Sequence, residues 1–167
     1  THGAISLERA VPLAPSLDTF GWFAKDAATY EKVAEVLLGS GEGDRGEGWQ
    51  EPYRLAAVDA LLLGEAEAAE YERMVDIVSA ALGAPVSAPA LSHSVDDLYW
   101  SFRRIQAHEA WQAHGAWLSQ RDRGLGPGVK ERFAFGATVT GKEVEADRRR
   151  RDAFRSELAG MLGENGL

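Results

Sequence analysis

His108 and Glu109 begin the H-E-x-x-H pattern, in which two histidines on one helix face bind zinc and the glutamate serves as a base. The pattern needs its second histidine at position 112, where the sequence has Gln112. His114 cannot replace it, because on a regular helix its imidazole points about 240° away from that of His108. We therefore expect no metal site, and no other cofactor is predicted.

Two further patterns suggest chemistry but lack the context that such chemistry needs. Ser92-His93-Ser94 places hydroxyls beside an imidazole, yet side chains adjacent in sequence rarely form the hydrogen-bonded line of a nucleophile and its base. Residues 41–46 satisfy the G-x-G-x-x-G pattern. A predicted helix precedes them, whereas the dinucleotide-binding motif needs a strand before the glycines and a helix after them. We identify no catalytic residue in this chain.

Glu109 is the best candidate for a buried polar group. The helix predicted at residues 95–119 carries an apolar stripe, formed by Leu98, Phe102, Ile105 and Ala116. Glu109 falls near the middle of this stripe, where an ionised carboxylate needs a hydrogen-bonded or charged partner. Backbone amides or an arginine could supply that partner in a purely structural role.

Local signals predict a mostly helical α/β arrangement. Helices are expected at residues 26–38, 65–82, 95–119 and from 141 onwards. Their caps are Asp26 for the first helix, Ser94 with Asp97 for the third, and Thr140 with Glu143 for the last. Short strands of a larger mixed sheet are expected near residues 4–7, 53–60 and 85–91, although residues 53–63 could equally form a short helix.

Composition and charge exclude several classes of protein. With 167 residues and 45% hydrophobic content, the chain is expected to form one domain. Its net charge of −8 argues against nucleic-acid binding, and the run Arg148 to Arg151 is expected to spread around a solvated, salt-bridged helix. No apolar run approaches the ~20 residues that span a membrane, and no leader opens the chain, so we expect a cytoplasmic protein without membrane contact.

Two groups of motifs follow one another in a fixed order along the chain. The first part has Thr1 and Gly3, then Pro12-Leu13-Ala14-Pro15-Ser16, then Asp18-Thr19 and Gly21. The second half has Phe102-Arg103, Gln106, Glu109-Ala110-Trp111, Gly115 and Trp117, then Leu125-Gly126-Pro127, Val129, Arg132 and Gly136. In this order the motifs resemble those of the amidase-signature hydrolases, which cleave amide C–N bonds. The resemblance covers nearly the whole chain.

The resemblance implies that the catalytic residues lie upstream of this chain. These hydrolases use a lysine, a serine in a cis peptide and a nucleophilic serine, all before the T-x-G turn that Thr1 begins here. Residues 1–167 are therefore expected to be a single segment, interior or C-terminal, of an amidase-signature domain. The resemblance implies a small-molecule amide as substrate of the complete enzyme, and the isolated chain is expected to be inactive.

The resemblance also suggests two substrate-binding residues, Phe102 and Arg132. In relatives that bind glutamine, a tyrosine stands near the position of Phe102, and an arginine near Arg132 meets the substrate carboxylate. Phe102 departs from that pattern and favours a more apolar amide. A salt bridge from Arg132 to a carboxylate such as Glu109 is the structural alternative.

One alternative function is a non-catalytic, α-rich binding or structural domain. Under either function, uncovered strand edges or helix faces could pair two copies of the chain into a homo-oligomer.

Overall fold

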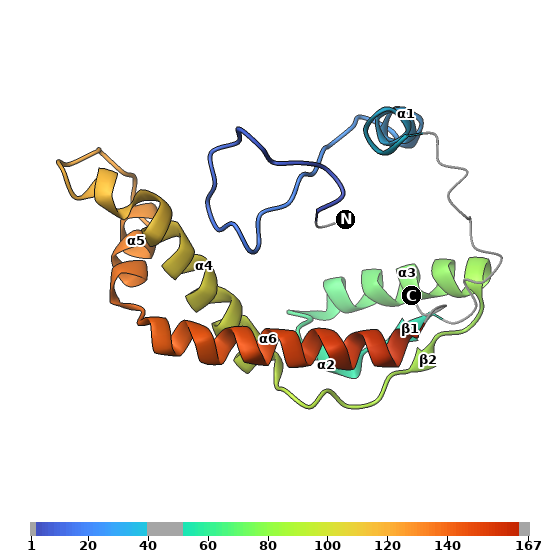
Figure 1. Cartoon of the computed structure of the whole chain (residues 1–167). Coiled ribbons are helices and arrows are strands. Elements are labelled where there is room, and N and C mark those ends of the chain that lie inside the picture. Colours follow the sequence, from blue (N-terminus) through green and yellow to red (C-terminus); the bar gives the residue numbers. More distant parts are fainter. Residues whose placement is uncertain (1–2, 40–51, 164–167) are drawn as a thin grey trace. The chain divides into compact units, whose positions relative to one another are not determined.

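The computed structural model describes residues 3–39 and 52–163 (Figure 1). The chain divides into two compact units, each assembled from segments that are distant in sequence. Thr1–Arg45 and Phe102–Asp147 form the first unit, and Gly46–Ser101 and Arg148–Leu167 form the second. Within the described residues, no helix is long and apolar enough to cross a membrane.

Helix α1 (Ala27–Leu38) confirms the first predicted helix and its cap. The carboxylate of Asp26 accepts a hydrogen bond of 2.8 Å from the backbone N–H of Thr29. This bond, with a further one from the Thr29 side chain, holds the pKa of Asp26 below its ordinary value. The helix ends at Gly39, whose φ of 84° lies in the region that favours glycine.

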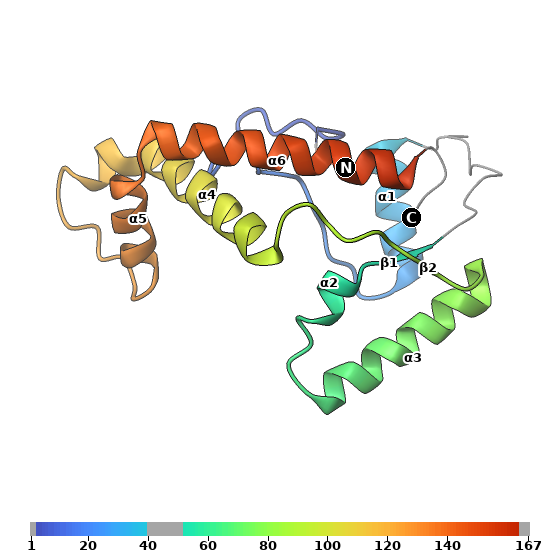
Figure 2. The same cartoon turned by 90° about the horizontal axis from the view of Figure 1, so that it is seen from below.

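The core of the first unit lies where helices α4 (Val95–Leu118), α5 (Val129–Thr138) and the start of α6 (Gly141–Leu162) meet. Ile105, Val139 and Val144 form a buried apolar cluster, against which Leu17 and Phe135 pack. Both views show α5 beside the C-terminal half of α4 (Figures 1 and 2). The N-terminal segment therefore reaches the same core as the helices through Leu17.

The second unit contains a strand–helix–strand arrangement (Figure 1). Strand β1 (Tyr53–Arg54) pairs in parallel with β2 (Val86–Ser87), and helices α2 (Ala56–Asp59) and α3 (Glu65–Leu82) connect them. Residues 53–63, which the sequence left open between strand and helix, thus contain a short strand followed by a short helix. Helix α3 has the bounds predicted for it and is followed by Gly83, whose φ is 98°.

An ionic cluster holds β1 against the helices that follow it. The guanidinium of Arg54 donates to Asp59 at 2.9 Å and to Glu72 at 2.5 Å, and it lies 5.1 Å from the centroid of the Tyr71 ring. Hydrogen bonds from Arg54 lower the pKa of Glu72, while a hydrogen bond to Asp59 raises the pKa of Tyr71.

The strand predicted at residues 4–7 is wrong, because this segment forms a turn and a bend. Its polar groups bond locally: the backbone N–H of Ala10 donates to the carbonyl of Leu7 at 3.0 Å, and that of Glu8 donates to Ser6 Oγ at 3.2 Å. A strand needs a neighbouring strand for its backbone groups, and the one sheet of the described residues has only β1 and β2. The predicted strands near 53–60 and 85–91 are likewise shortened to two residues each.

Candidate functional site

Residues 12–18, part of the motif that starts the chain, form a closed turn. The carboxylate of Asp18 accepts hydrogen bonds from the backbone N–H groups of Leu13 at 2.9 Å and Ala14 at 3.1 Å. In return, the backbone N–H of Asp18 donates to the carbonyl of Ala14 at 2.8 Å. Aspartate suits this position because its short carboxylate reaches backbone groups a few residues away. The turn therefore keeps its shape through its own hydrogen bonds.

Glu109 fastens this turn to α4. Its carboxylate accepts hydrogen bonds from the backbone N–H of Ser16 at 2.9 Å and from Ser16 Oγ at 2.7 Å. Glu109 is only 7% exposed, as the sequence predicted. Its partners include the backbone amide and the hydroxyl of Ser16, and through them the carboxylate anchors the turn. His114, five residues further along α4, donates from Nε2 to the carbonyl of Pro12 at 2.7 Å.

Helix α5 lies directly against α4 because residue 136 is glycine. A Cβ added to Gly136 would collide with the backbone carbonyl of Ala107 and would stand 3.2 Å from Cβ of Trp111. His108 supports the end of the same helix by donating from Nδ1 to the carbonyl of Val139 at 3.2 Å. This close approach brings the first turns of α5, where Arg132 stands, to the face of α4.

A hollow of about 270 Å³ lies in the first unit, where the closed turn, α4 and α5 contribute side chains. Its lining residues are Leu13, Arg103, Gln106, Ala107, Ala110, Val129, Arg132 and Phe133. Two arginines and one glutamine thus line the hollow together with apolar side chains, and no lining residue is acidic. Such a hollow can hold a small molecule with an apolar body and a carbonyl or anionic group.

The two residues proposed for substrate binding differ in their relation to this hollow. Arg132 lines it, whereas Phe102 lies on α4, is 42% exposed and is not among the lining residues. The sequence analysis quoted Arg103 and Gln106 as motif residues but did not propose them for substrate binding. A signal was nevertheless present, because residues 103, 106, 107 and 110 recur at the spacing that places them on one face of a helix.

The remaining candidates lie away from the hollow or have structural partners. Both the backbone N–H and Oγ of Ser92 donate to the carboxylate of Glu157, at 2.7 Å and 2.6 Å. Within the described ranges, no three histidine, aspartate or glutamate side chains gather as metal ligands would. The glycine pattern at residues 41–46 lies outside the described residues.

The arginine-rich helix makes the polar contacts that its composition predicted. In the first unit, Arg104 forms a bidentate ion pair with the buried carboxylate of Asp147, at 2.6 Å and 2.8 Å. In the second unit, Arg150 donates to Ser101 Oγ at 2.9 Å, and Arg151 pairs with Asp152 at 3.0 Å.

Comparisons with known proteins relate the chain to amidases. No protein-family model matches the sequence. Amidase 1 of Arabidopsis thaliana is 29% identical over 194 aligned positions, and Amidase 1 of Oryza sativa subsp. japonica is 23% identical over 193; both alignments cover the whole chain. They cover 46% and 44% of these relatives, so the chain spans less than half of their length.

A crystal structure of an amidase supports the relationship at the level of the fold. Its likeness has a TM-score of 0.77 at 25% sequence identity and covers 97% of this chain and 37% of the solved one. Whole-chain sequence matches and the fold point to the same group, so this chain is similar to amidases and corresponds to a portion of these longer proteins.

Proposed function

We propose that this chain is part of an amidase that hydrolyses carboxamide C–N bonds, and that it contributes scaffold and one wall of the substrate pocket. The observation that carries the proposal is the hollow at Arg132, because its walls come from the segments whose motifs resemble the amidase-signature hydrolases. The closed turn at residues 12–18 and the face of α4 both contribute to it.

The catalytic serines and lysine are proposed to come from sequence that precedes Thr1. The relatives named amidase are more than twice as long as the part that this chain matches, which leaves room for such residues. Ser92, the serine that precedes His93, donates its hydroxyl hydrogen to the carboxylate of Glu157 at 2.6 Å. It is therefore not hydrogen-bonded to an imidazole, as a serine nucleophile activated by histidine would be.

Arg132 is the residue of this chain for which a role at the substrate is proposed. Its guanidinium can donate paired hydrogen bonds to a carboxylate or carbonyl of a ligand in the hollow. The apolar side chains of Leu13, Val129 and Phe133 favour a substrate with an apolar body. Phe102 remains a secondary candidate through the resemblance alone.

The test is to compare the complete gene product with the isolated 167-residue chain. Release of ammonia from phenylacetamide, benzamide and glutamine would be measured for both proteins. The complete protein is expected to hydrolyse at least one amide, and the isolated chain is expected to hydrolyse none. Inactivity of the complete protein on a broad amide panel, or turnover by the isolated chain, would overturn the proposal.

The pocket role is tested in the complete protein by Arg132→Ala. Loss of a charge-assisted contact of about 1.5–3 kcal/mol should lower kcat/KM about 10- to 100-fold. Arg73→Ala is a matched control, because Arg73 is exposed and pairs with Glu70 on the surface of α3. Equal kinetics for the two variants would show that Arg132 has no role in binding.

A further inference from the structure

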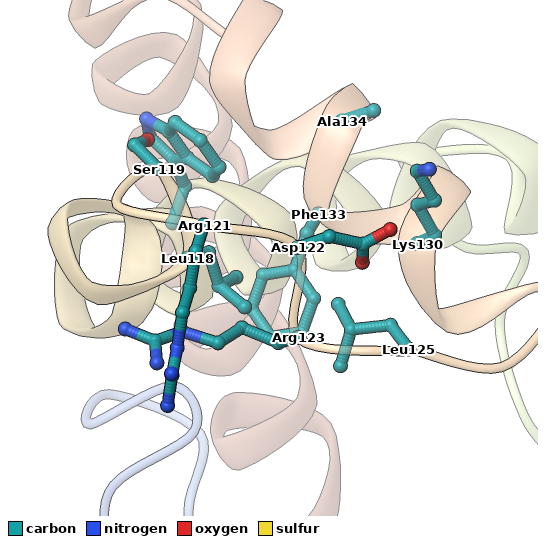
Figure 3. A pocket seen from close by; sticks show the side chains of 10 residues that line it. Leu118, Ser119, Arg121, Asp122, Arg123, Leu125, Lys130, Phe133 and Ala134 are labelled. Carbon is teal, nitrogen blue, oxygen red and sulfur yellow. The ribbon is translucent and has the colours of Figure 1, made fainter.

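A second hollow, of about 350 Å³, lies in the first unit beyond the C-terminal end of α4 (Figure 3). Leu118 comes from the last turn of α4, Leu125 from the loop that follows, and Phe133 from α5. Their apolar side chains form one part of its lining. The volume is that of a small-molecule site, large enough for a ligand with one ring.

The charged side chains of this hollow are mostly cationic. Arg121, Arg123 and Lys130 line it together with one acidic residue, Asp122. The carboxylate of Asp122 already has a partner within its own loop, because its Oδ1 accepts a hydrogen bond of 2.9 Å from the backbone N–H of Gly124. The hollow therefore favours an anionic ligand.

Arg123 is held in position by groups around it. Its Nε and Nη2 donate to the carbonyl of Trp117 at 3.1 Å and 2.8 Å, and Nη2 also donates to Gln120 Oε1 at 3.0 Å. The guanidinium carbon lies 4.1 Å from the centroid of the Trp117 ring. These contacts leave the two Nη1 hydrogens for a ligand, on a side chain whose conformational entropy is already reduced.

Arg121, unlike Arg123, is not held by neighbouring groups. No hydrogen bond or ion pair joins its guanidinium to any residue in the described part of the chain. In the close view, Arg121 and Arg123 extend toward the same side of the hollow, while Asp122 and Lys130 lie on the other (Figure 3). Arg121 is thus an exposed cation whose strongest available partner would be an anion from solution.

We propose that this hollow binds a small molecule with a single apolar ring and a carboxylate. The ring would contact Leu118, Leu125 and Phe133, and Arg121 and Arg123 would donate hydrogen bonds to the carboxylate. A planar carboxylate fits the paired donors of a guanidinium, and the apolar lining disfavours a strongly hydrated ion without an apolar body. This proposal can be tested separately from the proposed amide hydrolysis, because the measurements concern ligand binding and require no turnover of an amide.

Binding of phenylacetate to the complete protein tests the proposal. Saturation-transfer NMR and calorimetry would measure its Kd, with phenylethanol as the neutral analogue of similar shape. Phenylacetate is expected to bind at least tenfold more tightly than phenylethanol, and its binding should weaken as salt is added. Arg121→Ala should raise the Kd for phenylacetate about tenfold, and the charge reversal Arg121→Glu should raise it further.

Two controls make the result specific. Arg73→Ala removes an exposed guanidinium elsewhere and should leave the Kd unchanged. Arg132→Ala alters the first hollow, which shares Phe133 with this one, and should have less effect than Arg121→Ala. Equal binding of phenylacetate and phenylethanol, or a Kd that responds to Arg132→Ala and not to Arg121→Ala, would refute the site.

Discussion

Glu109 shows how one side chain of the family motif serves the fold. It stands on an otherwise apolar stripe of α4, where a carboxylate without partners would be costly. Ser16 removes that cost with two hydrogen bonds, one from its backbone and one from its hydroxyl. These bonds hold the closed turn, and with it Leu13, against α4 and the hollow at Arg132. Glu109 thus positions the closed turn through its bonds to Ser16.

Replacing Ser16 with alanine should destabilise the first unit, because the buried carboxylate of Glu109 loses its hydroxyl partner. A hydrogen bond to a charged group contributes about 1.5–3 kcal/mol, and the free energy of unfolding should fall by about that amount in urea titrations. Ser156→Ala is the matched control, since Ser156 Oγ is exposed on α6 and bonds a carbonyl of its own helix at 3.1 Å. Equal losses for the two variants would contradict the anchoring role.

The helices show that local sequence decides where these elements begin. Thr140 and Glu143 form the predicted cap of α6: Thr140 Oγ1 donates to Glu143 at 2.6 Å, and the Glu143 N–H donates back at 3.3 Å. The bond from Thr140 Oγ1, followed by a bond of 2.8 Å from the backbone N–H of Thr140 to the same carboxylate, holds the pKa of Glu143 below its ordinary value. Further along α6, Glu157 binds both polar groups of Ser92 and fastens the segment before α4.

The contact between Ser92 and Glu157 should be lost in acid. Hydrogen bonds from the Ser92 side chain and backbone hold the pKa of Glu157 below the ordinary 4.5. Because the folded-state pKa is lowered, the stabilising contribution is complete above pH 4.5 and disappears as the pH falls through the folded-state value. Amide hydrogen exchange at Ser92, corrected for the intrinsic rate, should therefore accelerate as the pH falls through the folded-state pKa of Glu157.

Glu157→Gln provides the control for this pH dependence. Glutamine keeps the shape of the side chain but does not titrate, so the variant should show faster exchange at neutral pH and no acceleration specific to Ser92 in acid. An unchanged pH response in the variant would mean that another group controls this segment.

Viewed as a whole, the chain exposes unusually many large apolar side chains. Helix α3 has no buried residue, and its exposed apolar side chains are Met74, Ile77, Val78 and Leu82. A face of this kind on a single helix is normally covered by other protein. Because the chain matches less than half of its amidase relatives, we propose that other parts of a complete enzyme cover such surfaces, and that isolated copies use them to self-associate.

Self-association of the isolated chain can be tested by charging this face. Sedimentation equilibrium should show dimers or larger species for the unaltered chain, and Ile77→Lys should shift the population toward monomer, because burying an ammonium in an apolar contact is unfavourable. Ala69→Lys adds the same charge at an exposed position of α3 that lies about 12 Å along the helix from Ile77, and it should have little effect. A monomeric unaltered chain would contradict the proposal.

Much of the local structure was readable from sequence because its determinants lie within a few residues. Asp26, Ser94 and Thr140 begin their helices through hydrogen bonds to groups three positions away, and all three caps were predicted. The strand at residues 4–7 was predicted wrongly because its own residues cannot decide whether it forms. A strand also needs a second segment that supplies the other half of its hydrogen-bonded ladder.

Sequence also showed the resemblance to amidases, because the motif residues occur in a recognisable order along the chain. It placed Glu109 in the interior but left its partner open, and it did not propose Arg103 or Gln106 for substrate binding. Ser16 and Glu109 are 93 positions apart, and both hollows depend on how α5 packs on α4 through Gly136. Only the tertiary structure decides such contacts, since they require chain segments to be brought together by burial of a shared core and not by the preferences of neighbouring residues.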